Sequence, residues 1–333
     1  MSFKFLSFLA KCCYNSHTNG RKILRDNRVI LLIISASRRT DIPALYSQWF
    51  MNRLQEGYAL IPNPRNPKRL GRVEFSPDKV DCIIFWTKNP APMLDKLWEI
   101  EERGYSFYFQ FTLTPYDQRL ERNLPPKSEL IRTFRVLAER IGPEKVVWRY
   151  DPIIIDSTYT LKWHIEHFAE MCAKLNLYTK RIILSFVDPQ ISLDRKIRAL
   201  TEDEIHTLAS PFSEIAAQYN LPLFTCAEEI DLTQYGIDHS SCIDQKLIEE
   251  IIGCPIKAKK DRNQREACQC IESIDLGVYD TCINGCTYCY ATSNLKRALG
   301  NVQNHDPKSP ILTGYPKGDE IITDRTTPSQ KIS

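Results

Sequence analysis

The sequence predicts an α/β protein built as a (βα) barrel, in a partial or permuted version of the TIM-like form. From Val29 onward, short apolar or β-branched runs alternate with longer helical patterns, which is typical of repeated βα units and a parallel sheet. The residues that end these runs are unusually polar, as they are at the C-terminal face of such barrels. Length and composition fit a globular protein, since 43% of the 333 residues are hydrophobic and 26% are charged.

Composition divides the chain into four segments. Residues 1–28 are expected to be a disordered N-terminal extension, and 29–226 to form the barrel. Residues 227–300 are a cysteine-rich segment expected to close the barrel and bind a cluster, and 301–333 are a polar tail, extended or disordered from about Asn304. No run approaches the roughly 18 apolar residues of a membrane helix. The net charge of +3 is too small to argue for nucleic acid.

Seven apolar or β-branched runs are expected to be the strands of the parallel sheet. They are Val29–Ser35, Asp81–Trp86, Tyr105–Leu113, Lys145–Tyr150, Arg181–Val187, Pro222–Cys226 and Ile274–Tyr279. Two further runs between Gly57 and Phe75 flank a turn-rich stretch at 62–67, and this pattern predicts a hairpin outside the barrel.

Several helices carry recognisable start and stop signals. Ser128 precedes an apolar face that ends at Gly142-Pro143, and Thr160 precedes a second apolar face at helical spacing. Thr201 and Glu204 form a capping box at the start of a third helix.

Polar residues at the ends of the predicted strands are the candidate site residues. We take Arg149, Asp151, Cys226 and Glu228 as catalytic candidates, since the C-terminal ends of barrel strands carry the chemistry. Helix caps and turns are the alternative explanation for each single residue. Arg39 and Arg149 favour a functional role, because a buried guanidinium needs an anionic partner.

The strongest signal is a C-x3-C-x2-C motif formed by Cys282, Cys286 and Cys289. Three thiolates on so tight a loop converge on one point, and Gly285 lets the backbone curl around whatever lies there. A [4Fe-4S] cluster held by three cysteines leaves its fourth iron open to another ligand. A structural zinc site is the alternative, but it requires a fourth ligand and usually paired C-x2-C motifs. The spacing therefore favours the cluster.

This loop resembles the cluster loop of the radical S-adenosylmethionine (SAM) enzymes. The resemblance implies that SAM chelates the open iron, that Tyr288 lies near the adenine, and that a flavodoxin or ferredoxin supplies electrons. In typical members the motif follows the first strand, whereas here it lies near the end of the chain.

We therefore expect a permuted barrel in which the cluster unit closes beside Val29–Ser35. The loop from Ser35 to Asp41 would then bind the methionine part of SAM. Ser35 and Ser37 offer hydroxyls, and Arg38 or Arg39 could pair with the carboxylate. The glycine-glycine-glutamate pattern common in that loop is absent.

The span from Val29 to about Pro310 also resembles an uncharacterised bacterial family, domain of unknown function 1848. The resemblance rests on the terminal cysteines and on four motifs: Ser35–Pro43, Phe85–Pro90, Gln110–Thr114 and Trp148–Pro152. It implies a C-terminal cysteine cluster like the one that radical SAM enzymes carry near their N-terminus. The resemblance does not imply a particular reaction or substrate.

Four further cysteines, Cys226, Cys242, Cys268 and Cys270, are expected to form a second group. An auxiliary iron–sulfur cluster is the preferred interpretation, a zinc site the alternative, and a redox disulfide the third choice because clustered cysteines suggest a reducing cytoplasm. Cys226 could instead act alone as a hydrogen-atom donor. Cys254 lies in the same region and is not assigned to this group.

These observations together predict a cytoplasmic radical SAM-type enzyme that reductively cleaves SAM, with an unknown substrate. The alternative is a non-catalytic zinc or iron–sulfur module, associated with nucleic acid through Arg38, Arg39, Lys68 and Arg69.

Overall fold

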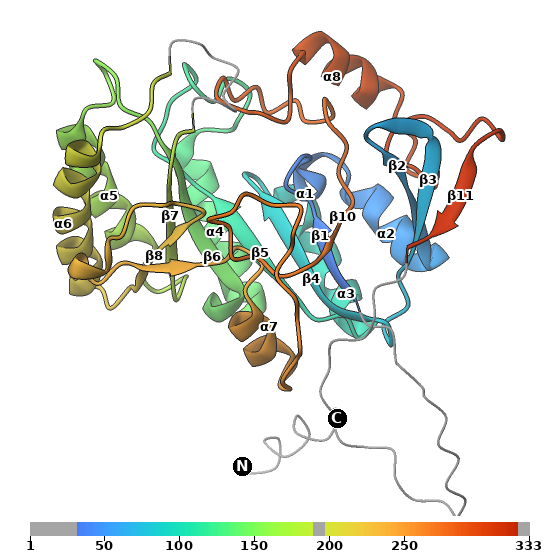
Figure 1. Ribbon diagram of the computed structural model, residues 1–333, viewed down its shortest axis with the longest axis horizontal. Helices are drawn as coiled ribbons and strands as arrows, with labels where there is room; N and C mark the ends of the chain where they lie inside the picture. Colours follow the sequence, from blue (N-terminus) through green and yellow to red (C-terminus); the bar gives the residue numbers. More distant parts are fainter. Residues whose placement is uncertain (1–31, 189–196, 326–333) are drawn as a thin grey trace, which may run out of the picture.

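The computed structural model describes residues 32–188 and 197–325, which form a large parallel sheet and a smaller second sheet (Figure 1). The large sheet consists of β1 (Leu32–Ala36), β4 (Val80–Thr87), β5 (Phe107–Thr112), β6 (Val146–Ile153), β7 (Ile182–Phe186), β8 (Leu223–Cys226), β9 (Asp238–Ser240) and β10 (Ile274–Asp275). The second sheet consists of β2 (Tyr58–Asn63), β3 (Asn66–Glu74) and β11 (Ile321–Asp324). A strand is found at each of the seven predicted positions and the predicted hairpin is confirmed, although residues 29–31 of the first lie outside the described residues and the last covers only Ile274–Asp275. Strands β9 and β11 were not predicted.

Helices connect the strands. The α-helices are α1 (Ile42–Leu45), α2 (Ser47–Glu56), α3 (Leu97–Glu102), α4 (Lys127–Ile141), α5 (Leu161–Leu175), α6 (Glu202–Gln218), α7 (Gln245–Ile252) and α8 (Leu295–Gln303). The short 3-10 helices are η1 (Ala91–Lys96), η2 (Pro143–Lys145) and η3 (Thr233–Tyr235). Thr160 caps α5, and Thr201 with Glu204 forms the predicted capping box of α6.

The large sheet is open, and this corrects the predicted barrel. Its strand order is β10-β1-β4-β5-β6-β7-β8-β9, with parallel pairing throughout. Within the described residues the edge strands β9 and β10 do not pair with each other. The physical reason lies in the chain between them, because residues 241–273 pack across the inner face of the sheet, where a closed barrel would have its interior.

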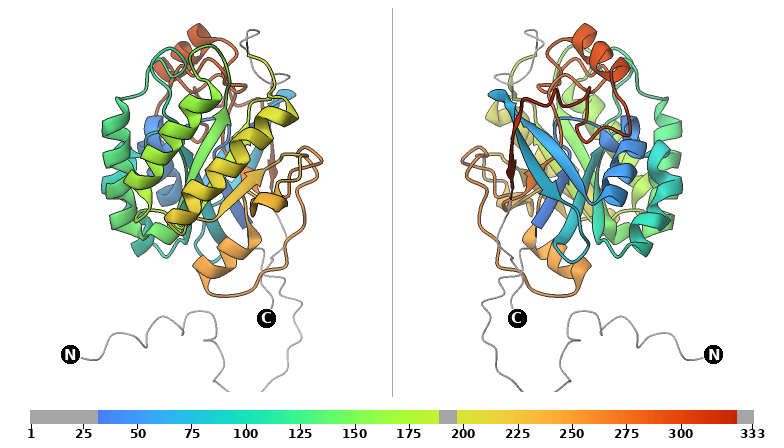
Figure 2. Two further views of the ribbon diagram at one scale, coloured as in Figure 1. Left: turned by 90° about the vertical axis from the view of Figure 1, so that its left-hand side faces the viewer. Right: turned by 90° about the vertical axis from the view of Figure 1, so that its right-hand side faces the viewer.

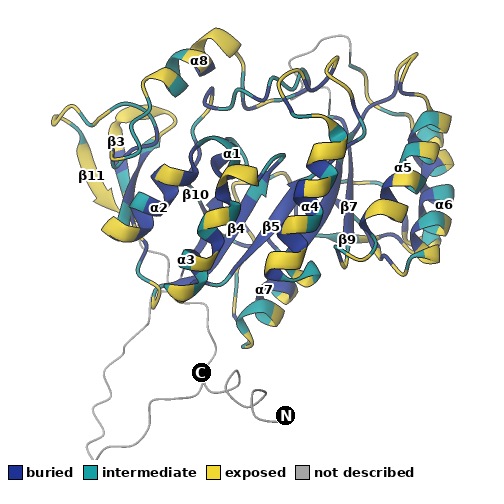
Figure 3. Ribbon diagram, turned by 180° about the vertical axis from the view of Figure 1, so that it is seen from behind, coloured by how far each residue is buried: buried dark blue, intermediate teal, exposed yellow. Residues whose placement is uncertain are grey.

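Each face of the sheet has its own apolar layer. Alternate side chains such as Ile34, Phe85 and Trp148 pack under α2 to α6 in the larger core. The intervening side chains, such as Ile33 and Ile84, face α7 and the cysteine-rich segment. Figure 2 shows α4, α5 and α6 together on one side of the sheet, and Figure 3 shows their exposed outer faces over buried strands. The alternation follows from the two-residue period of a strand.

Strand β10, the last strand of the large sheet in sequence, lies beside β1, as the permuted order requires. Ser35 pairs with Asp275 in the parallel register, and Leu276 N donates to Ser35 O at 3.0 Å. The Asp275 carboxylate also accepts hydrogen bonds from Ser37 Oγ at 2.7 Å and Arg38 N at 3.0 Å. Since β10 is only two residues long, these side-chain contacts fix it more than strand pairing does.

The tail predicted to be extended or disordered from Asn304 is instead folded onto the second sheet between 304 and 325. Ile311 and Leu312 are buried, and Trp49 Nε1 donates to Ser309 O at 2.9 Å. Strand β11 pairs in parallel with β3. Two buried apolar residues are thus enough to anchor a polar segment. The predicted extension 1–28 lies outside the described residues.

None of the helices in the described ranges is long and apolar enough to span a bilayer.

Replacing Asp275 by alanine should lower the free energy of unfolding by about 1–3 kcal/mol, because the hydroxyls of Ser35 and Ser37 and two backbone N–H groups lose their acceptor. Urea unfolding of the metal-free protein measures this loss. Asp275→Asn keeps one carbonyl oxygen and should lose less. An unchanged unfolding free energy in Asp275→Ala would show that this carboxylate does not hold β10 to β1.

Candidate functional site

A cavity of about 520 Å³ opens at the carboxyl ends of the parallel strands. It is lined by residues that follow or end β1, β4, β6, β7 and β8, and by the loop 282–291. Because parallel strands bring their carboxyl ends to one edge of the sheet, residues far apart in sequence meet there. The predicted candidates Arg149, Asp151 and Cys226 line this cavity, together with the C-x3-C-x2-C cysteines.

The three motif cysteines are half-buried on one side of the cavity. Burial raises the pKa of the Cys282 thiol to about 12, and it raises the pKa of Cys286 well above the usual value. The charge of the Cys289 thiolate adds to both effects, so the three sulfurs lie close enough to influence one another. Ala291 N donates to Cys289 Sγ at 3.3 Å. Gly285 has φ +71°, and a Cβ there would lie 2.9 Å from Asn123 Nδ2, so glycine is required.

Backbone contacts tie this loop to the chain that follows β5. Glu121 and Cys286 form an isolated antiparallel bridge, and Thr287 N donates to Leu120 O at 2.9 Å. Asn123 N donates to Asn284 O at 3.1 Å. The loop is therefore paired along its length with a neighbouring segment and does not project freely into solvent.

Glu121 is a buried carboxylate at the centre of this contact. It accepts hydrogen bonds from Lys88 Nζ at 2.7 Å and Thr114 Oγ1 at 3.0 Å, and also from Lys127 and the Tyr288 hydroxyl. Burial alone would raise the pKa of Glu121, but the charges of Lys88 and Lys127 lower that pKa to about 2. The carboxylate is therefore ionised at neutral pH and holds two ammonium groups beside the cysteine loop.

Asp41 joins three loops in a similar way. Its carboxylate accepts from Thr87 Oγ1 at 2.7 Å, Lys88 N at 2.8 Å, Ala44 N at 3.1 Å and Asn284 Nδ2 at 3.0 Å. Burial raises the pKa of Asp41, and these hydrogen bonds oppose the shift. One carboxylate thus connects the ends of β1 and β4 with the cysteine loop.

The predicted SAM loop after β1 is brought to the cavity, but its serines are engaged elsewhere. The Ser35 and Ser37 hydroxyls donate to Asp275 at 3.2 and 2.7 Å. The two arginines separate. Arg38 lies 5.2 Å from the Trp86 ring and faces the second cysteine group, whereas Arg39 lies over Tyr279, near the motif loop.

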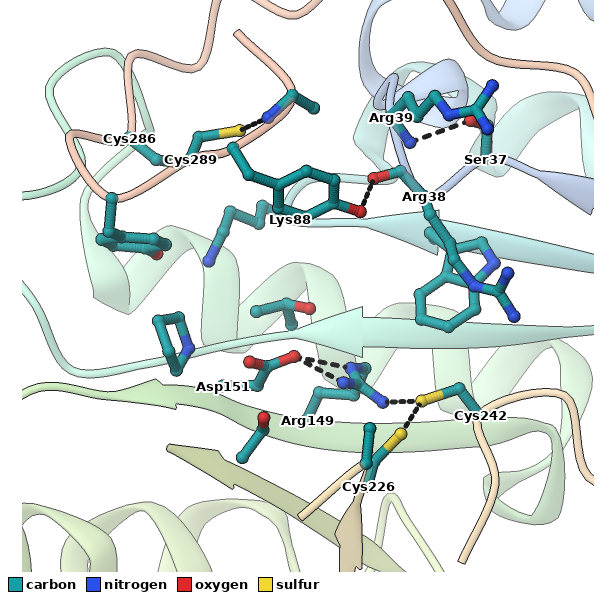
Figure 4. A pocket seen from close by; sticks show the side chains of 18 of the residues that line it. Ser37, Arg38, Arg39, Lys88, Arg149, Asp151, Cys226, Cys242, Cys286 and Cys289 are labelled. Carbon is teal, nitrogen blue, oxygen red and sulfur yellow. Dashed lines mark hydrogen bonds and ion pairs between the residues drawn. The ribbon is translucent and has the colours of Figure 1, made fainter. Parts of the chain in front are cut away.

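The second cysteine group lies on the opposite side of the cavity from the motif loop (Figure 4). The sulfurs of Cys226 and Cys242 are 2.7 Å apart, and Arg149 Nη1 donates to Cys242 Sγ at 2.6 Å. The neighbouring thiols of Cys226, Cys242 and Cys268 lower the pKa of Cys270, so the four groups lie close enough to influence one another. All four predicted members are thus brought together.

Arg149 also connects to the catalytic candidate Asp151, whose Oδ2 accepts from Arg149 Nε at 3.1 Å. Glu228 differs from the other candidates. It does not contribute to the described lining of the cavity, and its carboxylate accepts from Ser185 Oγ at 2.8 Å and Phe186 N at 2.9 Å. Glu228, which follows β8, therefore binds the end of β7.

Sequence reasoning missed Glu121 and Trp86. Glu121 lies in an irregular segment between β5 and α4, where no periodic pattern marks it. Trp86 was recognised as the end of an apolar run and as part of the Phe85–Pro90 motif, but not as a site residue. Across 32–188 and 197–325, no three or more histidine, cysteine, aspartate or glutamate side chains are grouped so that they could hold a metal ion.

Comparison with known proteins gives one match. The sequence model of a family described as "Domain of unknown function (DUF1848)" matches residues 33–291. No curated protein and no solved structure matches the chain.

Acid should destabilise the protein partly through Glu121. Its folded-state pKa of about 2 lies below its ordinary value of 4.5, so its stabilising contribution is complete above about pH 4.5 and is lost as pH falls toward 2. The loss amounts to roughly 3 kcal/mol. Urea unfolding of metal-free protein between pH 3 and 6 should show a shallower pH dependence for Glu121→Gln than for the unmodified protein. Equal slopes would contradict this assignment.

Proposed function

The chain belongs to the DUF1848 family, and from the site that its matched region forms we propose an iron–sulfur enzyme of the radical SAM type. The substrate class is not assigned by this proposal. Its cofactors are a [4Fe-4S] cluster and SAM, and its partner is a small electron-donor protein, a flavodoxin or ferredoxin. We place this activity in the cytoplasm.

The observation that carries the proposal is the position of the three motif cysteines on one tight loop at the cavity. Cys282, Cys286 and Cys289 all line the cavity, and Gly285 permits the turn between them. Their chemistry fits a cubane cluster, since three thiolates hold three irons and leave the fourth open. The N–H donated by Ala291 to Cys289 Sγ is the kind of hydrogen bond that tunes cluster potentials. Such a cluster, when reduced, supplies one electron that cleaves SAM into methionine and a 5′-deoxyadenosyl radical.

The arrangement of β10 and β1 supports a permuted radical SAM core. The cysteine loop follows β10, and the neighbouring strand β1 carries the loop from Ser35 to Asp41, as the permuted order requires. In this interpretation the open sheet corresponds to a partial barrel. Ser35 and Ser37 support the site indirectly, because their hydroxyls hold Asp275.

Arg39 is the better candidate for the SAM carboxylate. Arg38 is drawn toward the second cysteine group, while Arg39 stays beside Tyr279 at the cavity. The Tyr288 ring lies 5.5 Å from Lys88 Nζ, and its hydroxyl is fixed on Glu121. Tyr288 can therefore present a rigid aromatic edge to the adenine.

The substrate would lie between the two cysteine groups. Arg149 and Asp151 line that part of the cavity and hold each other, so they can orient a polar substrate without moving. Cys226 lines the same space, and a hydrogen-atom donor role for its thiol is the alternative to metal ligation.

The nucleic-acid module is less well supported. Lys68 and Arg69 are exposed on β3, but Arg38 has a buried Nη2 atom and lines the cavity. These residues do not share one open basic surface, which a nucleic-acid backbone would need.

Anaerobically purified protein should be brown, contain iron and sulfide, and form 5′-deoxyadenosine from SAM after reduction with dithionite. The triple variant Cys282→Ala, Cys286→Ala, Cys289→Ala should form none, because the open-iron cluster loses its ligands. Chromatography of the nucleoside products measures both, and omission of dithionite is the control. A cluster-loaded protein that never cleaves SAM with any donor would refute the proposal.

Arg39→Ala should weaken SAM binding at least about tenfold while the iron content stays unchanged, because a charge-assisted pair is lost. Arg39→Lys should recover only part of the affinity, since lysine does not reproduce a bidentate contact. Equilibrium binding to cluster-loaded protein measures the affinity. The same affinity in Arg39→Ala as in the unmodified protein would remove this residue from the SAM site.

A further inference from the structure

We propose that Cys226, Cys242, Cys268 and Cys270 form a second metal site, in which four thiolates bind one tetrahedral ion of the zinc class. This four-thiol site is separate from the C-x3-C-x2-C loop, and the inference does not depend on the proposed function. It selects zinc, the alternative raised by the sequence, over a second cluster.

The four sulfurs come from segments that only the fold brings together. Cys226 ends β8, Cys242 follows β9, and Cys268 and Cys270 lie in the irregular chain before β10. All four side chains are buried. Cys226 and Cys242 are 2.7 Å apart at their sulfurs, and Cys268 and Cys270 line the same cavity. Four buried thiols that meet in this way are the ligand set of a closed, structural zinc site.

The surrounding protein fixes these ligands. Tyr108 Oη and Gln110 Nε2 both donate to Cys242 O at 2.7 Å, and both side chains project from the central strand β5. The backbone N–H of Ile243 points at Cys270 Sγ, at 3.4 Å. Hydrogen bonds of this kind orient metal ligands and stabilise thiolate sulfur.

Two guanidinium groups place positive charge beside the four cysteines, where it would stabilise thiolates. Arg149 Nη1 lies 2.6 Å from Cys242 Sγ, while Arg149 Nε is engaged by Asp151. Arg38 interacts electrostatically with Cys242, Cys268 and Cys270, and its buried Nη2 makes no hydrogen bond within the described residues. Arg149 already pairs with the Asp151 carboxylate, whereas Arg38 forms no ion pair within the described residues, so thiolates here would supply a counter-charge for Arg38. When one Zn²⁺ ion binds four thiols, each thiol releases its proton. The resulting group of one zinc ion and four thiolates has a net charge of −2.

The spacing of the sulfurs favours one ion over a cluster. The cysteines of a cubane cluster bind different irons and lie correspondingly far apart, whereas the sulfurs of Cys226 and Cys242 are in direct contact. With Zn–S bonds of about 2.3 Å, tetrahedral geometry places the sulfurs about 3.8 Å apart. Cys226 and Cys242 must therefore separate by about 1 Å to admit the ion. The short distance between the sulfurs of Cys226 and Cys242 explains why the four thiols, as they are arranged in this structure, do not form a group that could hold a metal ion.

The location of the site gives the ion a structural role. Residues 253–273 contain no helix and no strand, only isolated bridge positions such as the one between Lys260 and Ile271, yet they cover the inner face of the sheet. A metal that joins Cys268 and Cys270 to the ends of β8 and β9 would fix this segment and form one wall of the cavity. Metal ligation commonly orders such segments, because the binding free energy becomes folding free energy.

The test uses the full chain carrying Cys282→Ala, Cys286→Ala and Cys289→Ala, purified anaerobically and analysed for zinc, iron and sulfide. We expect one zinc per chain with neither iron nor sulfide. This background removes any metal bound to the C-x3-C-x2-C loop, so the result is independent of SAM cleavage. Adding Cys268→Ser to the triple variant should remove the zinc. Adding Cys254→Ser instead is the control: it changes a cysteine of the same region outside the four-thiol site, and the protein should keep its zinc.

A second measurement covers the case in which Cys268→Ser does not fold. The triple variant, stripped of metal and titrated with Co²⁺, should develop the visible bands of tetrahedral cobalt and a near-ultraviolet sulfur-to-cobalt charge-transfer band at one equivalent, and Zn²⁺ should abolish both. Iron with sulfide in the triple variant would overturn the proposal in favour of a second cluster. Failure to bind Zn²⁺ and Co²⁺, or a Cys226–Cys242 disulfide in the anaerobic protein, would also overturn it.

Discussion

The buried carboxylate of Glu121 is the contact on which the cavity depends. Removing a charge from water costs several kcal/mol, and the cost is offset here by two lysines and two hydroxyl donors. In return, the ionised carboxylate fixes the end of β4 through Lys88, the start of α4 through Lys127, and the cysteine loop through Tyr288. Without that charge, two ammonium groups would lie beside half-buried cysteines with no anion between them. The geometry of the motif loop is therefore set by a residue outside the motif.

The strand order explains why buried carboxylates make the contacts that hold the ends of the large sheet together. The last strand of the large sheet must pack beside the first, although their residues are about 240 positions apart in sequence, and β10 offers only two residues for pairing. Asp275 supplies what the short strand cannot, since it accepts hydrogen bonds from three residues at the end of β1. Asp41 extends these contacts, because it accepts from the end of β4 and from the cysteine loop. A closed barrel would secure this edge by strand pairing. In the open sheet, buried side-chain acceptors do so.

The sequence predicted those features whose signals are local. The helices beginning after Thr160 and Thr201 were found because capping and apolar spacing act within a few residues. Strand β9, with the sequence Asp-His-Ser, has no apolar run to reveal it. The α/β fold with a parallel sheet was predicted, but a closed barrel is not found among the described residues. The sequence could not decide this point, because a parallel strand is buried on both faces in an open or a closed sheet and its apolar pattern is the same. The sequence could not assign different roles to Arg38 and Arg39, because the directions in which two adjacent side chains point are known only once the backbone conformation is known. The iron–sulfur chemistry stays a prediction.

The two cysteine groups differ in how their ligands are supplied, and this difference bears on what each can do. The motif cysteines lie within eight residues of one loop, which borders the main cavity on one side and a second hollow of about 350 Å³ on the other. A loop of this kind leaves one coordination position to a ligand from the cavity. The four-thiol site collects ligands from three segments and places two arginines beside them. A complete ligand set with matched charge leaves no position for substrate. The proposed chemistry therefore belongs to the motif loop, and Arg149, which contacts both Cys242 and Asp151, links the fixed wall of the cavity to the space where a substrate would lie.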